Sequence, residues 1–180
     1  MILQEIGERT GTDKATYHKY CDFYQKNLPK RSFSGRLLEI GVFEGASLAM
    51  WREYYPKAEI IGIDNIDKSH LSIEGVTILK MDATDAKALD QLGMFDIIID
   101  DASHYTADQQ ATFEQLYVNQ LHNNGFYVME DLHTSLMPTY INSERTTLEY
   151  LEYALLEFNL FTLDPKVADS MTAIIKGGQL

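Results

Sequence analysis

Apolar residues gather in short runs that alternate with segments of helical periodicity. The strands predicted from these runs are residues 36–41, 58–64, 76–82, 95–100 and 125–131. The helices predicted from apolar spacings of three and four are residues 46–55, 86–93, 107–121 and 144–158. Continuous apolar strands are typical of sheets covered on both faces. The alternation predicts an α/β fold, with a mostly parallel sheet and helices on both faces.

The N-terminal residues have a different pattern, with helical spacing and no apolar strand. Two helices are predicted, at 2–9 and 14–28, and "TGTDK" between them has the composition of a turn. Thr12 or Asp13 is placed to cap the second helix. Residues 1–35 are therefore expected to form a short helical cap ahead of the sheet.

The C-terminal part ends in two more apolar runs, at 160–165 and 171–177. No helix is predicted between them, so one of the two is expected to run antiparallel. A chain of 180 residues has the length of one domain with a single sizeable core. We therefore expect one domain over 1–180, with 36–180 as its core.

The amino-acid composition limits which classes of molecule the protein is expected to bind. The chain carries 15 basic and 27 acidic residues, for a net charge of −12, which disfavours a nucleic-acid backbone as partner. No apolar run approaches the ~20 residues of a membrane helix, and the N-terminus lacks the basic flank of a secretory signal. The single cysteine, Cys21, cannot form an internal disulfide. These features favour a cytoplasmic protein with no membrane partner.

A glycine-containing loop follows the first predicted strand. Its sequence, "EIGVFEGAS", has the spacing E-x-G-x-x-x-G. Gly41 and Gly45 let the backbone approach a ligand closely and turn into the next helix. Glu39 brings a carboxylate that suits a cationic ligand, such as an ammonium or a sulfonium group.

Acidic residues also end the next two predicted strands. Asp64 follows the glycine loop by about 20 residues, a position from which an acidic side chain commonly binds ribose hydroxyls. Asp82, after the third strand, is placed to accept a hydrogen bond from an adenine amine. For either acid taken alone, the alternative of a local helix cap remains open.

The fourth and fifth strands end in "DDASH" and "EDLHTS". Neighbouring strands lie about 4.8 Å apart, and two carboxylates at ~5 Å repel by roughly 3 kcal/mol at an effective dielectric near 20. Asp100, Asp101, Glu130 and Asp131 would therefore need a cation, a shared proton or a basic partner. No lysine or arginine is evident nearby in the sequence, and carboxylate oxygens suit Mg²⁺ or Ca²⁺.

His104 follows Asp101 by three positions. A neutral imidazole can take a proton from a hydroxyl, and a metal bound to that hydroxyl would lower its pKa. We therefore predict that His104 is a general base that takes a proton from an alcohol and makes it nucleophilic. The alternative is a surface or helix-capping histidine.

The segment "LLEIGVFEGAS", together with Asp64 and Asp82, resembles the class I S-adenosylmethionine-dependent methyltransferases over residues 36–176. The resemblance implies a Rossmann-like sheet with strand order 3-2-1-4-5-7-6 and an antiparallel last strand. It also implies that Gly41 and Gly45 border the methionyl part of S-adenosylmethionine, Asp64 the ribose and Asp82 the adenine.

Shorter motifs, "GTDK", "YHKY", "DDASH" and "EDLHTS", resemble the macrocin- and mycinamicin-type sugar O-methyltransferases, which depend on Mg²⁺. The resemblance implies metal ligands at Asp101, Glu130 and Asp131. It further implies a catalytic base at His104 and a donor contact at Asp100. Those enzymes carry a long additional N-terminal domain, whereas about 35 residues precede the sheet in this chain.

These observations predict methyl transfer to a hydroxyl of a small natural product, such as a sugar unit of an antibiotic-like compound. Three alternatives remain open: a catechol or other small acceptor, a non-catalytic S-adenosylmethionine-binding module, and a hydroxylase. A homo-oligomer is a further expectation. Residues 133–146 are expected to form a lid over the acceptor or a surface loop.

Overall fold

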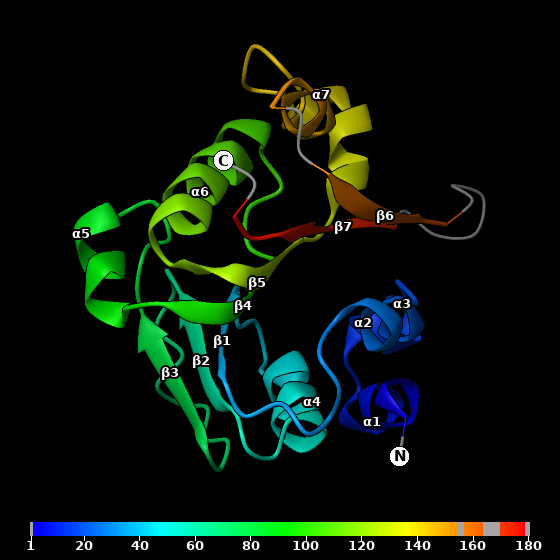
Figure 1. The fold of residues 1–180 in the computed structure, drawn as a ribbon, viewed down its shortest axis with the longest axis vertical. Coiled ribbons are helices and arrows are strands. Elements are labelled where there is room, and N and C mark those ends of the chain that lie inside the picture. Colours follow the sequence, from blue (N-terminus) through cyan, green and yellow to red (C-terminus); the bar gives the residue numbers. More distant parts are fainter. Residues whose placement is uncertain (1, 155–156, 164–169, 179–180) are drawn as a thin grey trace.

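The architecture is a single mixed sheet with helices on both faces (Figure 1). The computed structural model describes residues 2–154, 157–163 and 170–178. The strands are β1 (Arg36–Ile40), β2 (Glu59–Asp64), β3 (Val76–Lys80), β4 (Phe95–Asp100), β5 (Leu121–Met129), β6 (Phe158–Thr162) and β7 (Met171–Lys176). Their order is β3-β2-β1-β4-β5-β7-β6, which confirms the order implied by the methyltransferase resemblance.

The direction of the strands also agrees with the prediction. The pairs β1–β2, β1–β4, β2–β3 and β4–β5 are parallel, whereas β7 runs antiparallel to both of its neighbours. The parallel strands β1 to β5 therefore direct their carboxyl ends to the same edge of the sheet, which is where ligands bind in open α/β sheets.

The helices divide between the two faces of the sheet (Figure 1). On one side lie α1 (Leu3–Thr10), α2 (Asp13–Thr16), α3 (Cys21–Asn27) and α4 (Ala46–Tyr54). On the other lie α5 (Ala86–Leu89), α6 (Thr106–Asn119) and α7 (Thr147–Tyr153), with the short 3-10 turns η1 (Asp90–Leu92), η2 (Leu132–Leu136) and η3 (Pro138–Tyr140) in the connections.

Alternate residues of the central strands feed two hydrophobic cores. Ile97 and Ile99 of β4 belong to the core that contains Trp51 of α4, whereas Ile98 packs in the core that contains Phe113 of α6. All five side chains are fully buried. Burying a large apolar side chain contributes about 1.5–3 kcal/mol, so both faces stabilise the sheet.

The N-terminal helices differ from the prediction at one point that matters for the site. The helix expected over 14–28 is interrupted, because α2 ends at Thr16 and α3 begins at Cys21. Lys19 has a left-handed backbone (φ 60°), and the Tyr20 N–H donates to the Lys14 carbonyl oxygen at 2.8 Å. Sequence periodicity cannot detect this turn, since apolar residues continue at helical spacing through it.

Smaller differences lie at element ends. The helix expected over 144–158 begins at Thr147, after a capping box of Thr146 and Glu149, and its predicted positions 155–156 lie outside the described residues. The strand expected over 160–165 runs instead from Phe158 to Thr162, and positions 164–165 are also outside the described residues. Within the described ranges, no helix has the length and apolar character needed to cross a bilayer.

Candidate donor pocket and carboxylate cluster

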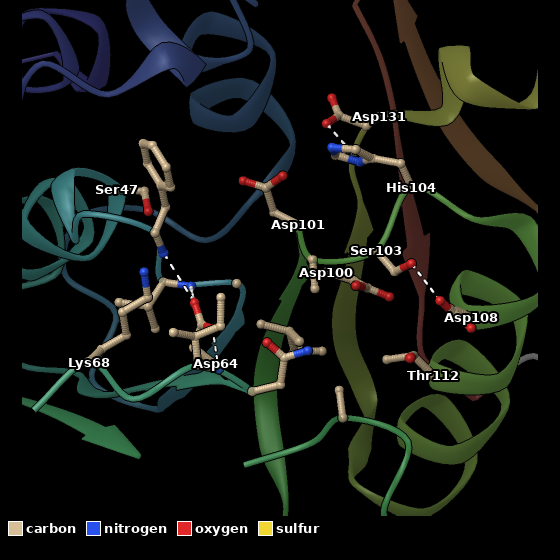
Figure 2. A pocket seen from close by; sticks show the side chains of 18 of the residues that line it. Ser47, Asp64, Lys68, Asp100, Asp101, Ser103, His104, Asp108, Thr112 and Asp131 are labelled. Carbon is tan, nitrogen blue, oxygen red and sulfur yellow. Dashed lines mark hydrogen bonds and ion pairs between the residues drawn. The ribbon is translucent and has the colours of Figure 1, made fainter. Parts of the chain in front are cut away.

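A cavity of about 950 Å³ lies at the carboxyl ends of β1, β2 and β4 (Figure 2). Four of the predicted donor-binding residues line it: Gly41, Asp64, Asp82 and Asp100. Two others, Glu39 and Gly45, are not among the described residues of its wall, where Ala46 and Ser47 take part instead. The structure therefore brings most of the predicted donor residues together around one cavity.

Asp64 fastens the glycine loop to the tip of β2. One carboxylate oxygen, Oδ2, accepts hydrogen bonds from the backbone N–H groups of Val42 at 3.0 Å and Phe43 at 3.3 Å. The other oxygen accepts from the Ile66 N–H at 2.9 Å. Asp64 thus shapes the cavity wall as well as lining it.

Asp82 has a local partner. Its Oδ1 accepts from the backbone N–H of Thr84 at 2.9 Å and from the Thr84 hydroxyl at 2.8 Å. These hydrogen bonds lower the pKa of the exposed Asp82 carboxyl. The local turn considered from the sequence is therefore present, and the residue still lies on the cavity wall.

Gly41 is the position where the loops after β1 and β4 meet. Its φ is 90°, and a Cβ atom there would lie 2.1 Å from the backbone oxygen of Asp101. Glycine alone permits this approach, since any side chain would both clash and strain the backbone. The contact sets the donor loop directly against the segment that carries Asp101.

Asp100 lies between the donor cavity and the core. Its Oδ2 accepts a hydrogen bond from the Tyr127 hydroxyl at 2.7 Å. Burial raises the pKa of Asp100 to about 7, and the Tyr127 hydrogen bond opposes that rise. The carboxyl is therefore held in one orientation from the β5 side.

The tips of β4 and β5 lie side by side, as predicted. The Glu130 N–H donates to the Asp100 carbonyl oxygen at 2.9 Å, which continues the strand pairing to the sheet edge. Asp101 and Asp131 line the cavity, whereas the Glu130 side chain is only 2% exposed and lies behind the wall.

Lys14 supplies a basic partner that sequence inspection missed. Its ammonium contacts the Asp101 carboxylate, lies 3.0 Å from Glu130 Oε2 and lies 3.5 Å from Glu39 Oε1. Glu39 therefore faces a cation of the protein itself and not a ligand in the cavity. Lys14 belongs to the quoted "GTDK" motif, but 87 residues separate it from Asp101 along the chain.

Glu39, Asp101, Glu130 and Lys14 form a largely buried cluster. Burial and the neighbouring charges shift the pKa values of its members in opposite directions. Burial raises the pKa of Glu39 to about 7, and the Lys14 ammonium opposes that rise. Burial also raises the pKa values of Glu130 and Asp101, again against the effect of Lys14. Burial lowers the pKa of Lys14, but the carboxylates of Asp101, Glu130 and Glu39 outweigh it and raise the pKa well above its usual value. Lys14 is thus a charged lysine within an acidic cluster.

His104 and Asp131 form a pair at the other end of the cluster (Figure 2). His104 Nδ1 lies 3.4 Å from Asp131 Oδ2, and the ring of Tyr140 meets the imidazole edge-on with centroids 5.9 Å apart. The Asp131 backbone is left-handed, with φ 55°, an uncommon conformation outside glycine that clusters at functional sites. The His104 side chain is 44% exposed and lines the cavity, so a ligand can reach it.

The carboxylates at the tips of β4 and β5 are the candidate ligands of a metal ion. Within residues 2–154, 157–163 and 170–178, no three His, Cys, Asp or Glu side chains form a group that could hold a metal ion. Among the same residues, however, Glu130 Oε1 is buried without a hydrogen-bond partner, and Asp131 Oδ1 is buried with only a 3.9 Å contact to His133 Nδ1. Carboxylate oxygens are the ligands that Mg²⁺ prefers, so the chemistry of these side chains fits a hard divalent ion, although their arrangement in this structure does not form a metal group.

Strand order, glycine loop and acidic strand tips together define the fold of class I S-adenosylmethionine-dependent methyltransferases. Within this class, the chain resembles the sugar O-methyltransferases of macrolide and tetracenomycin pathways. No model of a known protein family matches the chain.

Three comparisons carry the resemblance. The chain is 34% identical over 149 residues to mycinamicin VI 2''-O-methyltransferase of Micromonospora griseorubida, which covers 76% of this chain and 37% of the relative. It is 34% identical over 166 residues to 8-demethyl-8-alpha-L-rhamnosyl tetracenomycin-C 2'-O-methyltransferase of Streptomyces olivaceus, covering 83% of this chain and 44% of the relative. The solved MycE methyltransferase in complex with Mg, SAH and mycinamycin VI matches with a TM-score of 0.82, 27% identity, and coverage of 98% of this chain and 54% of that one. The chain thus spans less than half the length of these two curated relatives.

Proposed function

We propose that this protein is an S-adenosylmethionine-dependent, divalent-metal-assisted O-methyltransferase that acts on a sugar hydroxyl of a small natural product. The observation that carries the proposal is the position of His104, Asp101 and Asp131 on the wall of the same cavity that Asp64 and the glycine loop shape. The similarity to sugar O-methyltransferases supports the substrate class.

The donor occupies the cavity between β2 and β4 in this proposal. Gly41 gives its methionyl part close access to the backbone, Asp64 receives the ribose hydroxyls and Asp82 the adenine amine. Asp100 lies at the donor's edge, where its hydrogen bond from Tyr127 keeps the carboxyl fixed. Glu39 acts indirectly, because its carboxylate faces Lys14.

Asp101, Glu130 and Asp131 would hold the divalent ion, with Mg²⁺ as the expected metal. When bound, such an ion lowers the pKa of a coordinated hydroxyl and fixes its orientation. Asp101 and Asp131 present their carboxylates to the cavity, and Glu130 supplies a buried oxygen behind them.

His104 is the general base of the proposed reaction. Its imidazole takes the proton of the sugar hydroxyl while that oxygen forms a bond to the donor methyl carbon. The carbon–sulfur bond breaks at the same time, and its electron pair returns to the sulfonium sulfur, which leaves as the neutral thioether. Asp131, 3.4 Å from Nδ1, orients the ring and stabilises the imidazolium that forms.

The 133–146 segment is proposed to enclose the acceptor. It contains most of η2 and all of η3, and Asn142 Oδ1 accepts from the Ala107 N–H at 2.8 Å, which fastens the segment to the start of α6. Tyr140 within it contacts the His104 ring. Cytoplasmic location, a homo-oligomer and the single-domain division at residue 35 remain predictions.

The proposal is tested by incubating the protein with methyl-labelled S-adenosylmethionine, Mg²⁺ and matched acceptors. We expect labelled methyl in glycosylated macrolide or tetracenomycin-type compounds that carry a free sugar hydroxyl, detected by mass spectrometry. The corresponding aglycones and a simple catechol serve as controls and should remain unlabelled. Labelling of the catechol alone would contradict the substrate class. Binding of S-adenosylhomocysteine (SAH), the demethylated donor, without transfer to any acceptor would favour a binding module.

A further inference from the structure

Lys14 is the buried cation that the proposed reaction does not use. Its side chain is 1% exposed, and it reaches from α2 to carboxylates at the tips of three neighbouring strands. These are Glu39 on β1, Asp101 after β4 and Glu130 after β5. A lysine is almost never fully buried unless it is paired, so its position indicates a specific role.

The contacts of Lys14 leave oxygens of the same cluster free for a second cation. On Glu130, Lys14 pairs with Oε2 at 3.0 Å, whereas Oε1 is buried and has no hydrogen-bond partner in the described part of the chain. On Asp101, it contacts Oδ2. Asp131 faces the two histidines instead: its Oδ2 lies 3.4 Å from His104 Nδ1, and its buried Oδ1 accepts no hydrogen bond from the described residues and lies 3.9 Å from His133 Nδ1.

The two cations would reach the cluster from different directions. Gly11, Thr12 and Asp13 line the donor cavity, but Lys14 is not among the described residues of its wall. Asp101 and Asp131 do line it, so an ion that enters from the cavity meets their carboxylates at its wall. Lys14 contacts Asp101 and Glu130 from within the protein, through α2.

We infer that Lys14 is a positioning residue for the divalent ion: it holds one oxygen each of Asp101 and Glu130 and so orients both carboxylates for the metal. The inference rests on the proposed function, since it assumes that these residues are the metal ligands. Groups that orient metal ligands typically contribute about 10–100-fold to metal affinity. The "GTDK" motif thereby acquires a physical role at the site.

The test is a Lys14→Met variant, which keeps most of the side-chain volume and removes the ammonium. Magnesium affinity is measured by isothermal titration calorimetry with the protein saturated in SAH, and SAH affinity is measured separately without metal. We expect Mg²⁺ to bind about 10–100-fold more weakly and SAH affinity to change less than about twofold. Lys26→Met is the matched control, because Lys26 is an exposed lysine in the last turn of α3, outside the turn at Lys19.

The outcomes separate this inference from the proposed function. Normal Mg²⁺ binding by the unaltered protein with equal or tighter binding by Lys14→Met would overturn the positioning role alone. Equal losses of Mg²⁺ and SAH affinity would show a merely structural role. Failure of the unaltered protein to bind Mg²⁺ would overturn the proposed function and the inference together. If Lys14→Met does not fold, the charge-balanced variant Lys14→Met/Glu39→Gln carries the same measurement with the same expected loss.

Discussion

Replacement of His104 by alanine should reduce kcat for sugar methylation by about 10²–10⁴-fold, the usual contribution of a general base. The imidazole lines the donor cavity and pairs with Asp131 at 3.4 Å, so its loss leaves the hydroxyl proton without an acceptor. SAH affinity should stay within about twofold, because the donor-loop contacts of Asp64 do not involve His104. Single-turnover kinetics with saturating donor measures the chemical step directly.

The control for this variant is His122→Ala. His122 lies at the exposed start of β5, away from the residues that line the cavity. Its replacement should leave kcat unchanged. If the His104→Ala enzyme has a rate close to that of the unaltered protein, His104 is not the general base. It is then a surface histidine without a catalytic role.

Removal of divalent metal should lower methyl transfer by at least ~10²-fold. A metal ion stabilises developing charge by several kcal/mol, and each 1.36 kcal/mol corresponds to a factor of ten in rate. The expected loss is measured after treatment with excess EDTA and dialysis, and activity should return when Mg²⁺ is added. SAH binding should survive the chelator, since the Asp64 carboxylate is held by the backbone N–H groups of Val42, Phe43 and Ile66 and not by a metal ligand.

An undiminished rate in excess chelator would show that the carboxylate cluster is structural. In that case Lys14 alone would serve as its counter-ion, because it already contacts Asp101, Glu130 and Glu39. A partial loss that Mg²⁺ does not restore would indicate damage to the protein by the treatment, and a melting curve of the treated sample distinguishes this case.

Local sequence patterns predicted the sheet and the acidic residues at the carboxyl ends of its parallel strands. Runs such as "FDIIID" are apolar because both faces of the strand are covered, and β4 spans the residues expected for it. Two strand ends were equally predictable, since Asp64 and Asp100 terminate β2 and β4 as expected. Two others were less so, because β3 ends at Lys80 and β5 runs from Leu121 to Met129, whereas the pattern predicted 76–82 and 125–131. Parallel pairing then fixed which acidic residues would meet.

Long-range contacts were the part that the sequence could not provide. Lys14 lies 116 residues from Glu130 along the chain, and its burial depends on the turn at Lys19 that interrupts the expected helix. A lysine in a helix next to a turn has the pattern of a solvated residue, so charge counting left the acidic cluster without a basic partner. Likewise, the sequence around Glu39 indicates a cationic ligand. The actual cation beside Glu39 is Lys14, which comes from a distant segment of the chain.

The account depends on a divalent ion held between the tips of β4 and β5, and the most direct measurement is its location. Crystals grown with SAH and Mn²⁺ in place of Mg²⁺ would give an anomalous difference map. We predict a single strong peak bounded by Asp101, Glu130 and Asp131, with SAH in the cavity beside Asp64. A map with SAH clearly bound and no anomalous peak at these carboxylates would contradict the account.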